Sequence, residues 1–263
     1  MPASLNPAES AQALFIAEQS GEKLDLLTGT SCPQTPEQGY AIQAVFAELR
    51  NEAIAGWKIA ATAQAGRDHI NVDRPLGGRL LESAVSGDGS TVNLRHNRMR
   101  VAEVEIVLML GQDLSPQEQD FTEEQVAAAI ISVHPGLEFP DSRFADFTRV
   151  GAACLIADNA CASRFVLGPP NTSDIDLAAL AQLKTSLLIN DQTVTSGRGS
   201  DALGGPVTAL VWLANTLSRL GQPIKAGQFV TTGVTGNPSP VAPGDQVRAD
   251  LGELGSVCAR MTD

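Results

Sequence analysis

The sequence predicts an α+β fold in which an N-terminal helical cap is followed by a mainly antiparallel β-sheet or barrel. Two observations lead to this prediction: helix-start signals gather in the first third of the chain, and strand signals dominate after about residue 95. The chain has 263 residues, of which 43% are apolar and 18% are charged, so it can form one large globular domain. We expect a helical region over residues 1–95, which includes one short strand, and a β-rich domain over residues 96–263.

Helices are expected where a capping residue, a first-turn proline and an acid follow one another. Asn6-Pro7-Ala8-Glu9 has this order and predicts a helix to about Ser20. Thr35-Pro36-Glu37-Gln38 repeats it before apolar residues at helical spacing. Two later helices are a segment from the capping box Thr122–Gln125 to about Val133, and Pro206–Leu220, which Gly221 and Pro223 end.

Strands are expected in short apolar segments that are bounded by turn residues. They are Gly56–Ala61, Val101–Leu110, Lys184–Ile189, Thr193–Thr195, Phe229–Thr232, Gln246–Leu251 and Ser256–Met261. Asn190-Asp191 and Gly252–Gly255 are the turns of two hairpins.

Charge and composition exclude several classes of protein. Lys plus Arg is 18 and Asp plus Glu is 30, so the net charge is −12, which argues against a nucleic-acid partner. The longest apolar run without charge, Ala202–Ser218, is too short and too interrupted to span a membrane, and no signal peptide is recognisable. No pair of the four cysteines has a Cys-x-x-Cys spacing, and we expect reduced thiols in a cytoplasmic protein; they are Cys32, Cys154, Cys161 and Cys258.

Two glutamates in the predicted strand Val101–Leu110 are the first candidate for chemistry. Glu103 and Glu105 share one face of that strand, because side chains alternate, and they lie about 7 Å apart along it. Two carboxylates this close can converge on one hard cation such as Mg²⁺, Mn²⁺ or Ca²⁺. The alternative is that they form the solvated face of an edge strand.

Glu138 and Lys58 are further candidates. Glu138 lies in an apolar context, where an isolated acid is costly, so it can complete a three-carboxylate site. The alternative is a salt bridge that joins Glu138 or Asp141 to Arg143. Lys58 lies inside a short apolar strand, where it either reaches solvent at an edge or points into a pocket to bind a carboxylate or relay a proton.

Other motifs carry less chemistry. The glycine-rich segments Ser196–Ser200 and Leu203–Pro206 match neither a phosphate loop nor a dinucleotide fingerprint. Thr231–Gly236 is either a polar loop that binds a carboxylate or a plain turn. The three histidines have no metal-ligand spacing, and no Ser-His-Asp arrangement is readable.

Several short motifs, taken in their order along the chain, resemble those of the 2-oxopent-4-enoate hydratase and 4-oxalocrotonate decarboxylase family, within the fumarylacetoacetate hydrolase superfamily. They are Gly56-Trp57-Lys58-Ile59, Val72-Asp73-Arg74-Pro75, Val101–Glu105, Gly136-Leu137-Glu138 with Asp141-Ser142-Arg143, Ala157–Ala160, Ser196–Gly199, Val211–Ala214 and Leu254–Val257. They extend over nearly the whole chain, and the joint order is more specific than any one motif.

The resemblance implies a fumarylacetoacetate hydrolase-type fold whose β-rich region is the catalytic domain. It implies Mg²⁺ or Mn²⁺ on Glu103, Glu105 and Glu138, with Lys58 as catalytic residue. The matched motifs also offer substrate-binding residues, which are Thr62, Asp73, Arg143 and Ser196. The implied activity is that of a metal-dependent lyase on a short linear 2-oxo acid, with hydration of a 2-hydroxydienoate in aromatic meta-cleavage catabolism favoured. The implied assembly is a homo-oligomer, which can associate with a sister enzyme.

The sequence departs from the family pattern at two places. Leu76 and Gly77 stand where family members usually have an acid and an aromatic residue, and that acid is commonly assigned a proton-transfer role. Ala60-Ala61-Thr62-Ala63 replaces the usual Gly-Leu-Thr-Ser, so the hydroxyl of Thr62 is kept and that of the serine is lost. A 4-oxalocrotonate-type decarboxylase, and a catalytically weakened partner subunit of a hydratase–decarboxylase complex, therefore stay open as alternatives.

Overall fold

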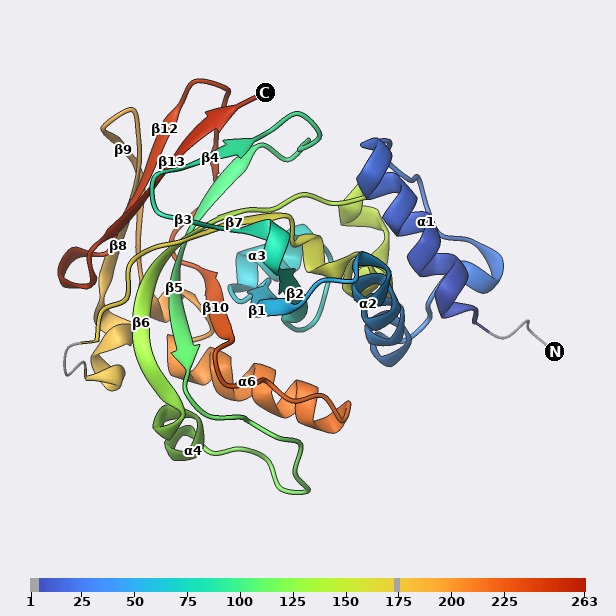
Figure 1. Ribbon diagram of the computed structural model, residues 1–263, viewed down its shortest axis with the longest axis horizontal. Helices are drawn as coiled ribbons and strands as arrows, with labels where there is room; N and C mark the ends of the chain where they lie inside the picture. The colour runs from blue at the N-terminus through green and yellow to red at the C-terminus, as the bar shows by residue number, and fades with distance from the viewer. Residues whose placement is uncertain (1–4, 173–175) are drawn as a thin grey trace.

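The computed structural model describes residues 5–172 and 176–263, and a strongly curled β-sheet forms its centre (Figure 1). The strand order of this sheet is β2 (Leu76–Leu81), β1 (Ile54–Ala60), β10 (Phe229–Val234), β5 (Val101–Leu110), β6 (Ile130–Phe139), β7 (Arg164–Leu167) and β3 (Val85–Gly87), with β11 (Ser239–Pro240) also paired to β5. A second sheet has the order β4 (Ser90–Asn93), β13 (Ser256–Thr262), β12 (Gln246–Asp250), β8 (Lys184–Ile189) and β9 (Gln192–Arg198).

Most strand pairs of both sheets are antiparallel, as predicted. The parallel pairs are β1 with β10, β3 with β7, and β4 with β13. The predicted division of the chain near residue 95 stays a prediction. Strands β1 and β2 precede that point and pair into the same sheet as β5, β6 and β10.

The N-terminal helices α1 (Pro7–Ser20) and α2 (Pro36–Arg50) begin at the predicted caps. The Asn6 side chain accepts from the Glu9 amide, and the Thr35 hydroxyl accepts from the Gln38 amide. Together with α5 (Gly151–Ala157) they form a separate apolar cluster, which lies beside the curled sheet on the side away from the second sheet (Figure 1). The helical cap is therefore confirmed.

The remaining helices are α3 (Gln64–His69), α4 (Glu123–Ala128) and α6 (Pro206–Arg219). No helix within the described residues has the length and hydropathy that a membrane span requires.

One predicted boundary is wrong. The capping box at Thr122 is present, but α4 ends at Ala128, and Ile130 begins strand β6 where the prediction continued the helix to about Val133. The segment Ile130–Val133 contains three β-branched residues, which favour strands, and Val133 pairs with Leu108 of β5. As a result, Glu138 lies on a central strand and not in a segment after a helix.

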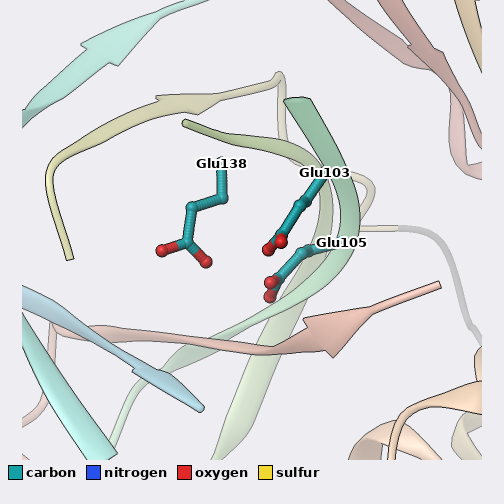
Figure 2. A group of neighbouring side chains, drawn as sticks. All are labelled: Glu103, Glu105 and Glu138. Atoms are coloured by element: carbon teal, nitrogen blue, oxygen red, sulfur yellow. The ribbon is translucent and has the colours of Figure 1, made fainter. Parts of the chain in front are cut away.

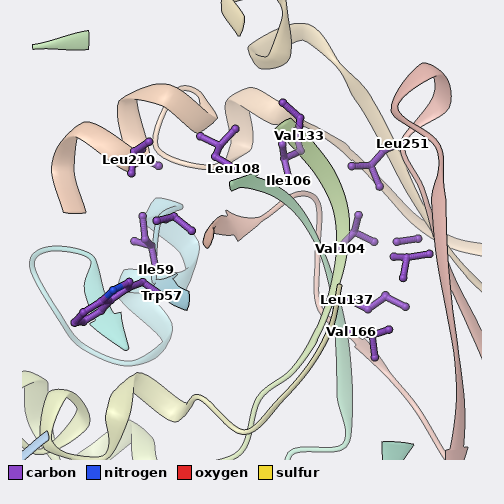
Figure 3. Packing of buried hydrophobic residues seen from close by; sticks show 14 of the residues in the cluster. Trp57, Ile59, Val104, Ile106, Leu108, Val133, Leu137, Val166, Leu210 and Leu251 are labelled. Carbon is purple, nitrogen blue, oxygen red and sulfur yellow. The ribbon is translucent and has the colours of Figure 1, made fainter. Parts of the chain in front are cut away.

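The largest apolar core packs one face of the curled sheet against α6 and the second sheet (Figure 3). Trp57 and Ile59 of β1 belong to it, as do Val104, Ile106 and Leu108 of β5. Because strand side chains alternate, the residues between these positions point to the opposite, concave face.

Arg143 lies at the centre of a buried polar network behind the concave face. Its guanidinium is 2.8 Å from Glu18 and 3.5 Å from Asp158, and it donates to the Ala162 carbonyl at 2.7 Å. The Asp158 carboxylate also accepts from the Ser142 hydroxyl at 2.6 Å. Burial raises the pKa of Asp158 to about 6 although Arg143 opposes this shift, so the pair is ionised at neutral pH.

The alternative in which Arg143 pairs with Glu138 or Asp141 is therefore wrong. Asp141 forms an ion pair with Lys23, and Arg143 pairs with Glu18 and Asp158.

Replacing Arg143 with Met should lower the free energy of unfolding by about 3 to 5 kcal/mol, because Asp158 then stays buried without its charged partner. Urea unfolding at pH 7 measures the change. Lys225→Met is the matched control, since Lys225 pairs with Asp113 at the surface, where an ion pair contributes less than about 1 kcal/mol. Equally small losses in both variants would contradict the role given to Arg143.

Candidate metal centre and active site

Three glutamates converge on the concave face of the curled sheet (Figure 2). Glu103 and Glu105 come from β5, and the β5–β6 register places Glu138 directly opposite Glu103. One carboxylate oxygen from each residue lies within 4.8 Å of the other two. Glu138 is fully buried, and Glu105 is 1% exposed. Strand β5 is central in its sheet, so the alternative of a solvated edge strand is wrong.

The three carboxylates differ in what holds them. Oε2 of Glu105 accepts from the Thr231 hydroxyl and, at 2.8 Å, from the Gly233 amide. Among the described residues, neither oxygen of Glu138 has a hydrogen-bond partner. The Lys58 ammonium is 3.0 Å from Oε1 of Glu138, but outside hydrogen-bonding geometry. A buried carboxylate in this condition requires a further positive partner.

Burial and repulsion from neighbouring carboxylates disfavour the charged forms of Glu103 and Glu105. Burial raises the pKa of Glu103 to about 7, and the neighbouring Glu138 adds to the shift. Burial, Glu138 and Glu103 raise the pKa of Glu105 well above its ordinary value. A donor set made only of carboxylate oxygens suits Mg²⁺, Mn²⁺ or Ca²⁺. The residues present therefore fit a hard divalent cation at this position.

Lys58 approaches the carboxylates from β1. It is 3% exposed, and its Nζ lies between Oε1 of Glu138 and the carbonyl of Ala160, to which it donates at 3.1 Å. Burial alone would lower the pKa of Lys58, but the three glutamates raise it above its ordinary value, so the ammonium is charged. Lys58 does not reach solvent at a sheet edge, which excludes that alternative.

An apolar layer lies on the same face beside the carboxylates. Phe165 and Phe229 stack with ring centroids 5.4 Å apart, within a cluster that also contains Leu80, Val107 and Ala162. Gly136 makes room for this layer, because a Cβ there would meet the Phe165 ring and the Val107 side chain. Since Gly136 pairs with Glu105, the rings lie close to that carboxylate. They exclude water and strengthen the local electrostatic interactions.

Thr62 also reaches this site. Its hydroxyl is buried and has no hydrogen-bond partner among the described residues. A Cβ on Gly233, whose amide donates to Glu105, would clash with that hydroxyl. Thr62 therefore presents an unused hydrogen-bonding group next to Glu105, and its assignment to substrate binding stays a prediction.

The other predicted substrate-binding residues make their described polar contacts elsewhere. Asp73 is exposed and pairs with Arg74 at 2.8 Å. Ser196 lies exposed on β9, with its hydroxyl 3.3 Å from that of Ser186. Arg143 belongs to the network with Glu18 and Asp158. Their roles toward a substrate stay predictions.

Sequence reasoning missed several residues of the site. The sequence predicts a strand over Phe229–Thr232, and for Thr231–Gly236 either a polar loop that binds a carboxylate or a plain turn; in the structure Thr231 and Gly233 both lie on β10 and donate to the carboxylate of Glu105. Gly136 inside a strand was a usable signal for close packing. The Ala160 carbonyl left no signal, because any residue provides a carbonyl.

Comparison with known proteins agrees with this geometry. Residues 45–262 match the family model described as fumarylacetoacetate (FAA) hydrolase C-terminal. The chain is 34% identical over 254 residues to a 2-keto-4-pentenoate hydratase of Paraburkholderia xenovorans (strain LB400), which covers 95% of this chain and 92% of that protein. It is 35% identical over 259 residues to a 2-hydroxyhexa-2,4-dienoate hydratase of Comamonas testosteroni, covering 96% of each.

Among solved structures, 4-oxalocrotonate decarboxylase from Pseudomonas putida G7, complexed with magnesium and adipate, superposes with a TM-score of 0.87. The sequence identity is 28%, and the alignment covers 98% of this chain and 99% of that chain. The match of sequence and fold confirms the resemblance: the chain belongs to the 2-oxopent-4-enoate hydratase and 4-oxalocrotonate decarboxylase family of the fumarylacetoacetate hydrolase superfamily.

Proposed function

We propose that this protein is a divalent-metal-dependent lyase that acts on a short linear 2-oxo acid, with hydration of a 2-hydroxydienoate in aromatic meta-cleavage catabolism as its reaction. The observation that carries the proposal is the buried Glu138 carboxylate, which lies near Glu103, Glu105 and the charged Lys58 but has no hydrogen-bond partner within the described part of the chain. Two hydratases at 34% and 35% identity support the substrate class.

Glu103, Glu105 and Glu138 would hold Mg²⁺ or Mn²⁺. Bound there, the ion would act as a Lewis acid toward the 2-oxo and carboxylate oxygens of the substrate. Thr231 and Gly233 keep Oε2 of Glu105 fixed. The Phe165 and Phe229 layer keeps bulk water away from this side.

Lys58 would supply the proton that hydration requires. The Lys58 ammonium would donate a proton to the terminal carbon of the 2-hydroxydienoate, and the proton of the 2-hydroxyl group would return to the neutral amine, which gives an unsaturated 2-oxo acid and restores the ammonium. Water then adds across the remaining C=C bond. Leu76 offers no proton, because its side chain is a hydrocarbon; it is 1% exposed and packs in an apolar cluster with Tyr40 and Leu155. Lys58 is the charged acid next to the carboxylates, so proton transfer is assigned to it.

The second candidate is decarboxylation of a 4-oxalocrotonate-type substrate, in which loss of CO₂ gives the same kind of enolate. The high structural similarity to a decarboxylase and the apolar residue at position 76 favour it. A catalytically weakened partner subunit of a hydratase–decarboxylase complex is the least supported candidate, since three neighbouring acids, two of them buried, would be destabilising without a cation.

Product analysis separates the candidates. The protein is incubated with Mg²⁺ and either 2-hydroxypenta-2,4-dienoate or 4-oxalocrotonate, and CO₂ is monitored. A hydratase converts the first substrate to a hydroxylated 2-oxo acid without CO₂. Release of CO₂ from the second substrate alone identifies the decarboxylase, and no turnover of either contradicts both activities.

We also propose that the protein is cytoplasmic, which its four free thiols support.

Glu103→Gln and Glu105→Gln should each weaken Mn²⁺ binding strongly. Loss of a residue that only supports a metal ligand lowers metal affinity by about 10- to 100-fold, and loss of a ligand itself should lower it further. The physical reason is loss of a charged oxygen ligand. Isothermal titration with Mn²⁺ and with Mg²⁺ measures the affinity. Glu253→Gln is the control, because Glu253 is an exposed acid on the short 3-10 helix Gly252–Leu254 and is not one of the three clustered glutamates. Wild-type affinity in both site variants would show that these residues do not bind the metal.

Lys58→Met should lower turnover by at least about tenfold, since a positioned proton-transfer group contributes roughly 10²- to 10⁴-fold. Mn²⁺ affinity should not fall, because the change removes a positive charge and no ligand. Steady-state kinetics and thermal unfolding are compared with those of Lys225→Met, which removes an exposed lysine. Full activity, or loss of folding and activity together, would leave Lys58 without a separable role.

We further propose a homo-oligomer, which can associate with a sister enzyme, in line with the resemblance. The apolar Val211–Leu213 segment does not supply an interface by itself, because Leu213 faces the core and Val211 and Trp212 pack against it. Closed symmetry is the usual form of such assemblies. Light scattering at micromolar concentration should give a multiple of the single-chain mass, and a single-chain mass would contradict the proposal.

A further inference from the structure

A strained turn lies against the stem of Lys58. Asn159, Ala160 and Cys161 follow one another with φ values of 57°, 50° and 60°. L-residues avoid this left-handed region, and three in succession persist only where surrounding contacts hold them. Asparagine adopts it more readily than most residues.

The Asn159 side chain fixes this turn to strand β2. Its Oδ1 accepts from the Arg79 amide at 2.6 Å, and its Nδ2 donates to the Arg79 carbonyl at 2.8 Å. The neighbouring Gly78 allows the close approach, because a Cβ there would meet both the Asn159 carbonyl and, at 3.2 Å, Cδ of Lys58. The turn and the Lys58 side chain therefore both lie next to Gly78.

The turn has two outward connections to the site. The Ala160 carbonyl accepts from Lys58 Nζ at 3.1 Å. The Cys161 carbonyl accepts from the Asp141 amide at 2.9 Å, just after the strand that carries Glu138. Both the lysine and the end of β6 are thus tied to the same three residues.

We infer that Asn159 is a positioning residue for Lys58: it locks the 159–161 turn so that the Ala160 carbonyl holds the ammonium beside Glu138. Without this acceptor, the ammonium would be drawn only toward the three carboxylates, where it would compete with a cation. The inference rests on the proposed function only in so far as Lys58 acts on the substrate.

Asn159→Gly is the test variant, because glycine tolerates the positive φ while both side-chain hydrogen bonds are lost. Asn215→Ala is the matched control. Asn215 on α6 forms the same two-bond clamp, accepting from the Phe121 amide at 2.6 Å and donating to its carbonyl at 3.2 Å. Both variants lose a buried side-chain clamp, but only Asn159 is connected to Lys58.

Asn159→Gly should lower kcat by about 10- to 100-fold, the effect of a misplaced catalytic group, and change KM by less than about twofold. Asn215→Ala should change neither constant. In the Lys58→Met background, Asn159→Gly should lower kcat no further. Wild-type kcat in Asn159→Gly would overturn the inference. So would an equal fold-loss of kcat when Asn159→Gly is introduced into the wild-type protein and into Lys58→Met.

A second measurement does not depend on turnover. The chain has four lysines, so the ammonium signal of Lys58 in a ¹⁵N-lysine spectrum is identified as the one absent from Lys58→Met. Asn159→Gly should shift or broaden that signal, and Asn215→Ala should leave it in place. An unchanged signal in Asn159→Gly would overturn the inference even if Lys58 proves catalytic. If Asn159→Gly shifts the Lys58 signal but Lys58→Met keeps wild-type turnover, only the proposed catalytic role of Lys58 is refuted.

Discussion

Three carboxylates lie within 4.8 Å of one another on the concave face of the curled sheet, and their mutual repulsion has to be balanced by positive charge. Ionised together, Glu103, Glu105 and Glu138 would be strongly unfavourable in a water-poor interior, and the raised pKa values of Glu103 and Glu105 express that cost. One lysine offsets one charge. A divalent cation bound among the carboxylates would offset the remaining two charges, so an arrangement that is unfavourable by itself would become a binding site.

The fold supplies the geometry for this balance. The β5–β6 register sets Glu138 opposite Glu103, and parallel pairing of β1 with β10 brings a lysine from the first quarter of the chain to the same face. Gly78 and Gly136 lack side chains where a turn backbone and a phenylalanine ring come close. The buried Arg143 and Asp158 then fix the segment behind the lysine. The site is thus assembled from elements far apart in sequence.

Much of this was predictable from local sequence patterns. Strand alternation put Glu103 and Glu105 on one face and Lys58 opposite Trp57 and Ile59, and capping residues fixed the first turns of α1 and α2. The features that local sequence patterns did not predict depend on packing between distant parts of the chain. The start of β6 at Ile130 is decided by its partner strand β5, and one of the two acidic partners of Arg143, Glu18, lies on a helix over 120 residues away. The roles of Asp73 and Ser196 rest on resemblance alone.

A crystal of the protein grown with Mn²⁺ would show whether the three glutamates together bind one divalent cation. We expect one strong anomalous peak on the concave face of the curled sheet, about 2.1 Å from an oxygen of each of Glu103, Glu105 and Glu138. Lys58 should stay within hydrogen-bond reach of the Ala160 carbonyl. An absence of density between the three carboxylates at saturating Mn²⁺, or a peak bound by other residues, would show that these glutamates do not form the metal site.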